Sequence, residues 1–332
     1  MKTKQLVAFV VAAAVFLVTG VSSVAINTWS SKITKENANM YSTLLGSSKE
    51  STPMSDYIAV IEVEGTIASE PTTSMWGEAE GYNHPSTMAY IDQLMEDKMN
   101  KGILLYMNTP GGAVTASDDM YLKLMEYKQQ TGRKIYCYFA DQSCSGGYYI
   151  SMAADEIYAN RNCWTGSIGV ILQTVNLKEL YDKLGIKEVN ITSGPNKAMG
   201  SSGEDLTEEQ RAILQSMVDE SYDQFVSIIV EGRGLSEQKV RQLADGRIYT
   251  AKQALEHDLI DGICTQDEYW DRVLDEVGED VIIYERAQDA YSLSSLFGTI
   301  EELQPKSDAE VMQEMLEKEK MGGLMYYADI VR

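Results

Sequence analysis

The pattern that decides the fold lies in the stretch Lys134-Ile-Tyr-Cys-Tyr-Phe-Ala-Asp-Gln-Ser-Cys-Ser-Gly-Gly-Tyr-Tyr-Ile150. It starts as an apolar, aromatic and β-branched run over 134–139, which predicts a buried strand. It then passes through Ser145 and two glycines into a segment over 148–154 that we expect to be helical. A strand that turns sharply into a helix is typical of parallel α/β sheets.

The same plan recurs on both sides of this stretch. The sequence predicts further strands over residues 57–64, 102–107, 156–159, 168–172 and 188–191. The expected helices are one capped by Ser86, one that Gly132 ends, one over 177–184, one that the Thr207–Gln210 capping box opens and that stops near Gly232 or Gly234, and two capped by Ser236 and Thr250. The predicted fold class is therefore α/β with a sheet rich in parallel strands.

The first residues differ in character from the rest. Residues 6–26 carry no charge, and 21 residues are long enough for a helix that crosses a bilayer. A signal peptide is the alternative, with a passable cleavage site at Ser22 to Ala25, and we favour an uncleaved anchor. We expect a short cytoplasmic tail and transmembrane anchor over 1–27 and a polar stalk over 28–55. A folded domain should follow over 56–283, and then a Met- and Glu-rich C-terminal tail over 284–332 that is helical or extended.

The net charge and the small numbers of histidines and cysteines argue against several functions. With 28 Lys and Arg against 50 Asp and Glu, the net charge of −22 disfavours nucleic acid as a partner. Only His84 and His257 are present, so a zinc site is not expected and a Ser-His-Asp triad would need one of these two. The four cysteines lack C-x-x-C spacing, so we interpret them as small buried thiols, with disulfides as the alternative. No cofactor or metal is expected.

Three predicted strands end in glycine-containing turns, where α/β proteins build their sites. These turns contain Gly111-Gly112, Ser145-Gly146-Gly147 and Gly166-Ser167. Ser145 lies where a strand turns into a helix, as in a nucleophile elbow, although the G-x-S-x-G pattern is absent. On local grounds alone a simple helix N-cap is the first interpretation of Ser145.

A serine nucleophile needs a base, and lysine can replace histidine in this role if its amine is kept neutral by desolvation. Lys197 is the candidate because it follows Ser193-Gly-Pro-Asn and precedes an uncharged stretch. An exposed loop lysine is the alternative interpretation.

Several motifs, in order, resemble the signal peptide peptidase A family in its short, single-repeat form, within the Clp/crotonase-type serine peptidases. They are Gly81-Tyr-Asn-His84, Gly102-Ile-Leu-Leu-Tyr-Met-Asn-Thr-Pro-Gly-Gly112, Ser145-Gly-Gly-Tyr-Tyr149, Ala153-Ala-Asp-Glu-Ile-Tyr-Ala159, Thr165-Gly-Ser-Ile-Gly-Val170, Ser193-Gly-Pro-Asn-Lys197 and Ala244-Asp-Gly-Arg-Ile-Tyr249. The likeness covers roughly residues 56 to 270. Cys144 and Thr109 depart from the family's usual alanine and serine.

The resemblance implies a fold of repeated β-β-α units and a role for five residues. Ser145 is the implied nucleophile and Lys197 the general base. Ser167 is implied to orient the lysine amine, and the backbone N–H groups of Gly112 and Gly146 to form the oxyanion hole. Single-repeat members complete each site with residues of a neighbouring protomer, which implies a homo-oligomer.

The resulting hypothesis is a single-pass protein of the cell membrane whose extracytoplasmic domain degrades released signal peptides and similar short apolar peptides. One alternative is a Clp-like peptidase specific for a membrane-protein partner. Another is a catalytically inactive scaffold that binds peptides. A further hypothesis concerns the apolar segment 324–328, which would lie in the substrate cleft and be trimmed there or block access.

Overall fold

The structure is a computed structural model, and it describes residues 53–70, 72–73, 79–278, 280–286 and 325–327. None of the helices in these residues is both long and apolar enough to cross a membrane. The expected anchor over 6–26 and most of the stalk over 28–55 lie outside the described residues. The expected division into domains stays a prediction, and strand β11 spans the expected boundary at residue 283.

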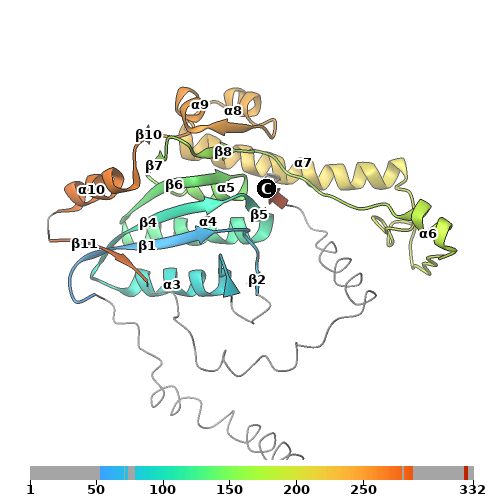
Figure 1. Cartoon of the computed structure of the whole chain (residues 1–332), viewed down its shortest axis with the longest axis horizontal. Coiled ribbons are helices and arrows are strands. Elements are labelled where there is room, and N and C mark those ends of the chain that lie inside the picture. Colours follow the sequence, from blue (N-terminus) through green and yellow to red (C-terminus); the bar gives the residue numbers. More distant parts are fainter. Residues whose placement is uncertain (1–52, 71, 74–78, 279, 287–324, 328–332) are drawn as a thin grey trace, which may run out of the picture. The chain divides into compact units, whose positions relative to one another are not determined.

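The described residues form strands and helices that alternate along much of the chain (Figure 1). The strands are β1 (Tyr57–Glu64), β2 (Thr72–Thr73), β3 (Ala79–Glu80), β4 (Asn100–Thr109), β5 (Gly111–Ala113), β6 (Lys134–Cys144), β7 (Glu156–Ala159), β8 (Trp164–Gly166), β9 (Ile248–Thr250), β10 (Gly262–Ile263), β11 (Ile282–Glu285) and β12 (Met325–Tyr327). The helices are α3 (His84–Glu96), α4 (Val114–Thr131), α5 (Gly146–Ser151), α6 (Lys178–Leu184), α7 (Glu208–Arg233), α8 (Glu237–Leu243), α9 (Ala251–Glu256) and α10 (Gln266–Val277).

The main sheet has the order β10-β7-β6-β4-β1-β11, and every pair in this row is parallel. The predicted α/β class with a parallel-rich sheet is thus confirmed. Strand β6 changes partner along its length, because Phe139 still pairs with β7 whereas Gln142 to Cys144 pair with β8. Strand β8 in turn pairs antiparallel with β9. The sheet therefore branches at β6, just before Ser145.

Side chains of the central strands alternate between two apolar clusters, as a sheet buried on both faces requires. On β6, Ile135, Cys137 and Phe139 pack into the larger cluster with α3, α4 and α5, while Tyr136 and Tyr138 pack against α10 on the other face (Figure 1). The continuous apolar run that predicted a buried strand is explained by this burial on both faces.

Several predicted helix starts and ends are confirmed. The capping boxes at Thr207 and Thr250 are present, Ser236 caps α8, and Gly132 and Gly234 end α4 and α7 in the left-handed conformation. Three expectations were wrong.

Ser86 does not cap a helix, because Asn83 accepts its N–H at 3.1 Å and α3 begins at His84. Residues 168–172 form no strand and contain only a single bridge at Ile171, since the strand is β8 and the chain turns at its end, where Gly166 and Ser167 both have positive φ. Residues 188–191 form no strand, because no neighbouring strand among the described residues is available to pair with them.

Candidate active site

Three neighbouring strands deliver the candidate residues to one edge of the sheet. Strands β4, β6 and β8 are parallel, with Thr109 beside Ser143 and Cys144 beside Gly166. The carboxyl ends of parallel strands meet at one edge, so the segments that follow lie next to each other. The structure therefore places Gly112, Ser145 with Gly146, and Ser167 at one edge of the sheet.

Ser145 has a backbone that few serines adopt. Its φ of 52° and ψ of −112° lie outside the regions that a residue with a Cβ prefers, and such strain costs about 1 to 3 kcal/mol. The turn is held from both sides, since the Ser145 N–H donates to the Gly166 carbonyl at 2.7 Å and the Ser145 carbonyl accepts the Tyr149 N–H at 2.9 Å. This is the geometry of a serine held at a sharp strand-to-helix turn.

The Ser145 hydroxyl is buried and has no hydrogen-bond partner within the described part of the chain. It occupies the N-cap position of α5, as the first interpretation expected, but its side chain makes no capping hydrogen bond. A buried hydroxyl without a partner costs about 1 to 3 kcal/mol. A strained backbone and an unsatisfied hydroxyl at the same residue are the marks of a functional group.

Ser167 repeats the unusual conformation one strand away. Its φ is 49°, its side chain is buried, and its N–H donates to the Arg247 carbonyl at 2.7 Å. Gly166 before it has a φ of 84°, and a Cβ there would lie 2.5 Å from the ring of Tyr249. The pairing of β8 with β9 thus fixes Ser167 beside the turn of Ser145.

Gly112 is fixed by Ile67, a residue that the sequence analysis did not single out. The Ile67 N–H donates to the Gly111 carbonyl at 2.9 Å, and the Ala113 N–H donates to the Ile67 carbonyl at 2.7 Å. A Cβ on Gly112 would lie 1.9 Å from the Ile67 carbonyl oxygen, so only glycine fits. Because successive residues of a strand point their N–H groups to opposite sides, the Gly112 N–H points away from Ile67.

Gly146 supplies the first N–H group of α5, and the first N–H groups of a helix have no intrahelical partner. The helix lies tightly against the end of β4, since a Cβ on Gly147 would lie 2.5 Å from Cγ2 of Thr109. Thr109 also holds β5, because its hydroxyl donates to the Gly65 carbonyl at 2.5 Å and accepts the Gly111 N–H at 3.0 Å. These contacts place the two candidate oxyanion donors on the same edge.

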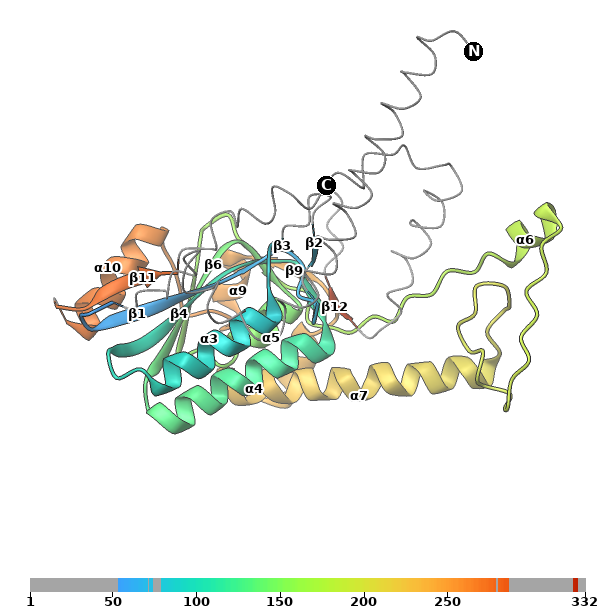
Figure 2. The same ribbon diagram turned by 90° about the horizontal axis from the view of Figure 1, so that it is seen from below.

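Lys197 lies elsewhere, in the segment 171–207 between β8 and α7, which we call the arm. Its side chain is exposed. Within the arm, Leu177 donates to the Ser202 carbonyl and Lys178 pairs with Asp205. The side chain of Gln210, at the start of α7, donates to the Pro195 carbonyl. Figure 2 shows α6 and the adjoining loops at the outer end of α7. Within one chain the structure thus does not bring Lys197 to Ser145.

The arm and the first half of α7 are uncovered. No residue from 171 to 224 is buried, and the buried residues of α7 all lie between 225 and 229. Apolar side chains are nevertheless frequent and exposed there: Ile171 49%, Val175 39%, Leu180 49%, Leu184 64%, Ile186 49%, Val189 77%, Ile191 97% and Met217 44%. Within one chain these apolar side chains remain uncovered.

Two other side chains that could react, those of Cys144 and His84, are buried in the core. Cys144 is buried, and burial raises the pKa of its thiol to about 12, so it is a packing residue as the sequence suggested. His84 is buried, its Nδ1 lies 2.7 Å from the hydroxyl of Tyr82, and burial lowers its pKa. No described contact links His84 or His257 to Ser145.

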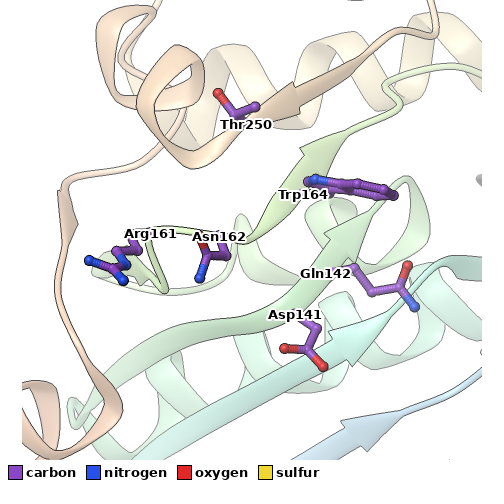
Figure 3. A pocket seen from close by; sticks show the side chains of 6 residues that line it. All are labelled: Asp141, Gln142, Arg161, Asn162, Trp164 and Thr250. Carbon is purple, nitrogen blue, oxygen red and sulfur yellow. The ribbon is translucent and has the colours of Figure 1, made fainter.

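A cavity of about 580 Å³ opens beside β6 and β8 (Figure 3). It is lined by Asp141, Gln142, Arg161, Asn162, Trp164 and Thr250. None of the candidate site residues lines it, so it is not assigned to the site.

Known proteins resemble part of this chain, and the matched part includes Ser145, Ser167 and Lys197. The pattern of peptidase family S49 matches residues 127–279. A relative from Enterococcus faecium, named "Putative signal peptide peptidase SppA", is 37% identical over 206 residues, which are 62% of this chain and 59% of the relative. A relative from Synechocystis that is named as a protease is 38% identical over 211 residues, which are 64% of this chain and 71% of the relative. The chloroplast serine protease SPPA of Arabidopsis thaliana is 28% identical over 215 residues, 30% of its own length.

Proposed function

This chain belongs to peptidase family S49, and on that premise we propose that it is a membrane-anchored serine endopeptidase that uses Ser145 and Lys197 to cut short apolar peptides such as released signal peptides. The observation that carries the proposal is Ser145 itself, with its strained backbone and its buried hydroxyl without a partner in the described residues. The finer fold proposed is of the Clp/crotonase type, and the branch of the sheet at β6 supports it.

In the proposed reaction the hydroxyl of Ser145 loses its proton to the neutral amine of Lys197 and its Oγ attacks the carbonyl carbon of the peptide bond. The N–H groups of Gly112 and Gly146 stabilise the oxyanion, each contributing about 3 kcal/mol to lowering the barrier. The lysine then passes the proton to the leaving amine, and water hydrolyses the acyl-enzyme. Ser167 orients the lysine amine.

We propose that the lysine comes from a second copy of the chain. The support is the arm, which carries Lys197 and whose apolar side chains are uncovered in one chain. Packed on a neighbouring copy, the arm would bury these side chains and desolvate the amine at the neighbour's Ser145, which a lysine base requires. The active form is thus a homo-oligomer with shared sites.

The anchor over residues 1–27 and an extracytoplasmic position of the peptidase domain belong to the same proposal. The support is the uncharged run over 6–26 in the sequence and the name of the Enterococcus faecium relative, which is that of a signal peptide peptidase. The peptides that such an enzyme cuts are themselves apolar and are released in the membrane, so an anchored site is suited to them.

The test is hydrolysis of a fluorogenic signal-peptide analogue by the full chain in detergent. Ser145→Ala and Lys197→Ala should each lower kcat by about 10⁴-fold or more, because nucleophile and base act as one unit. The matched controls are Ser143→Ala, also a buried serine whose hydroxyl has no partner in the described residues, and Lys187→Ala, another exposed lysine of the arm; both should stay within about threefold of wild type.

The pH profile adds a second readout, since kcat/KM should rise toward alkaline pH as the amine becomes able to accept a proton. Full activity of Ser145→Ala would overturn the proposal. Peptide binding without cleavage by the wild type would favour the inactive scaffold.

A further inference from the structure

The side chain of Tyr149 links the turn of the candidate nucleophile to the inner part of α7. Tyr149 lies in α5 and is buried, and its N–H donates to the Ser145 carbonyl at 2.9 Å. Its ring packs against that of Phe225, the first buried residue of α7, with 5.1 Å between the ring centroids. From this point α7 extends outward to the arm (Figure 2).

The hydroxyl of Tyr149 belongs to a cluster of three hydrogen bonds that joins α4, α5 and α7. It donates to Oδ1 of Asp118 in α4 at 2.5 Å. The side-chain amide of Gln224 in α7 donates to the same Oδ1 at 3.0 Å and to the Tyr149 hydroxyl at 2.7 Å. Each of these three polar groups therefore contacts the other two, and together they fix α7 relative to α5.

Gln224 and Tyr222 hold α7 from two nearly opposite sides. The Tyr222 hydroxyl donates to the Ala244 carbonyl, directly after α8, at 2.9 Å. Successive residues of a helix are about 100° apart, so side chains two positions apart point in nearly opposite directions. From Gln224 outward to Glu208 the helix buries no residue and rises by about 24 Å, so a tilt of about 5° moves its outer end by about 2 Å. The cluster thus lies where a small change in α7 displaces the arm.

We propose that Gln224 and Asp118 are positioning residues that set the place of Lys197 in the site of a neighbouring copy. The proposal rests on the proposed function, in which the arm carries Lys197 to Ser145 of a second copy. Because Tyr149 also holds the Ser145 carbonyl, the cluster relates the site that a chain builds to the site that its arm completes.

An exchange of the two side chains breaks and restores the cluster. Gln224→Glu alone removes the amide donor and sets a second carboxylate against that of Asp118, so the cluster should open. When Asp118→Asn is added, the amide and the carboxylate have changed places. The new amide is then able to donate to the new carboxylate and to the Tyr149 hydroxyl, and that hydroxyl to the carboxylate, which restores all three hydrogen bonds.

The kinetic test uses the full chain and the fluorogenic peptide. Gln224→Glu should lower kcat by at least about tenfold with KM within about twofold, because a displaced catalytic group slows the chemical step more than binding. The double variant should return to within about threefold of the wild-type kcat. Unchanged kcat in Gln224→Glu, or a loss that the double variant does not recover, would overturn the proposal.

The matched control is Gln130→Glu. Gln130 donates to Glu126 at 2.9 Å, so this variant also sets one carboxylate against another, but within α4 alone. Its kcat should stay within about twofold of wild type. An equal loss of kcat in Gln130→Glu and Gln224→Glu would contradict a specific role for the cluster.

A distance measurement separates this proposal from the proposed function. Nitroxide labels at Met99→Cys and Arg211→Cys report on α7 in full chains that also carry Cys264→Ser, since the other three cysteines are buried. In labelled chains diluted with unlabelled ones, the distance between the labels should shift by about 2 Å or more with Gln224→Glu and return in the double variant. If no form hydrolyses peptides but the distance responds in this way, the hold of the cluster on the arm stands and the peptidase fails. If peptides are cut while neither distance nor kcat responds, the peptidase stands and the positioning role fails.

Discussion

The edge of the sheet that carries Ser145 and the arm that carries Lys197 differ in how far their own chain buries them. The candidate nucleophile lies in a turn that its own chain holds completely, with Ser145, Ser167 and Gly112 all buried and all fixed by backbone hydrogen bonds. The arm buries none of its residues between 171 and 207, and Val189 and Ile191 are 77% and 97% exposed. One half of the proposed site thus lies within one chain, and under the proposal a second copy supplies the other half.

The largest effect is expected from breaking the arm's proposed contact. Val189→Asp with Ile191→Asp places two charges where the arm would be buried on a neighbour, and unpaired buried charges are costly. We expect the oligomer to dissociate and activity to fall by about 10⁴-fold, as in Lys197→Ala, because a separated copy has no lysine at its Ser145, while the melting of the folded domain changes little. Analytical ultracentrifugation in detergent and the peptide assay measure the two effects.

The control for that variant is Leu122→Asp with Met99→Asp, two apolar residues of the main domain that are 55% and 44% exposed. Assembly and activity should be retained in this control. Active monomers in the arm variant, or an oligomer that the arm variant leaves intact, would contradict the account.

A smaller effect is expected from Gly112→Ala on the finished side of the site. The added Cβ would collide with the Ile67 carbonyl, so β5 must move and take the Gly112 N–H with it. Loss of one oxyanion donor lowers kcat by about 10²- to 10³-fold. Gly132→Ala is a comparison with free space around the Cβ, and it should cost stability through its positive φ but leave kcat unchanged. Similar kcat values for both variants would count against the role of Gly112.

The smallest effect concerns how the main domain holds the inner end of α7. The Arg233 guanidinium donates two hydrogen bonds to Asp261, at 2.8 and 2.9 Å, and the Ile157 N–H donates a third at 2.8 Å. Burial alone would raise the pKa of Asp261, but the hydrogen bonds from Arg233 and Ile157 outweigh it and the pKa is lowered. Asp261→Asn should therefore cost about 1 to 2 kcal/mol near neutral pH, a modest value because the carboxylate is partly exposed.

The sign of the pH effect follows from that lowered pKa. The stabilisation is present above the ordinary aspartate pKa of about 3.9 and is lost as the pH falls through the lower folded value. Chemical unfolding at several pH values should show a smaller acid-side loss in Asp261→Asn than in wild type. In the arm, Asp205→Asn breaks the exposed pair with Lys178 and should change stability immeasurably; a larger effect of Asp205 than of Asp261 would reverse the comparison.

Local patterns in the sequence were sufficient for the strands β1, β4 and β6, which are buried on both faces, and for the starts of α7, α8 and α9, which carry their own caps. The run 134–139 and the Thr250 capping box are examples in which propensity, pattern and packing agree. The run 188–191 was mistaken for a strand because its apolar residues suit a sheet, whereas in the described chain they have no partner. Apolar patterns indicate that a surface is to be covered, but they do not tell which molecule covers it.

The turns of the candidate site were predictable from the sequence, but the contacts that fix them were not. The turns around Ser145, Gly112 and Ser167 are visible in the sequence, since glycine and serine punctuate three consecutive strand ends. The role of Ile67 was not predictable, because it depends on two backbone hydrogen bonds across 44 or more residues and leaves no local pattern.

The central claim is that each site combines Ser145 of one copy with Lys197 of another, and complementation tests it most directly. Full chains carrying Ser145→Ala and Lys197→Ala are each inactive alone under the account. Expressed together in equal amounts, they should recover about a quarter of the wild-type activity, because random assembly gives each site an even chance of either intact residue. No recovery in a verified mixed oligomer would place both residues of each site in one chain and contradict the account.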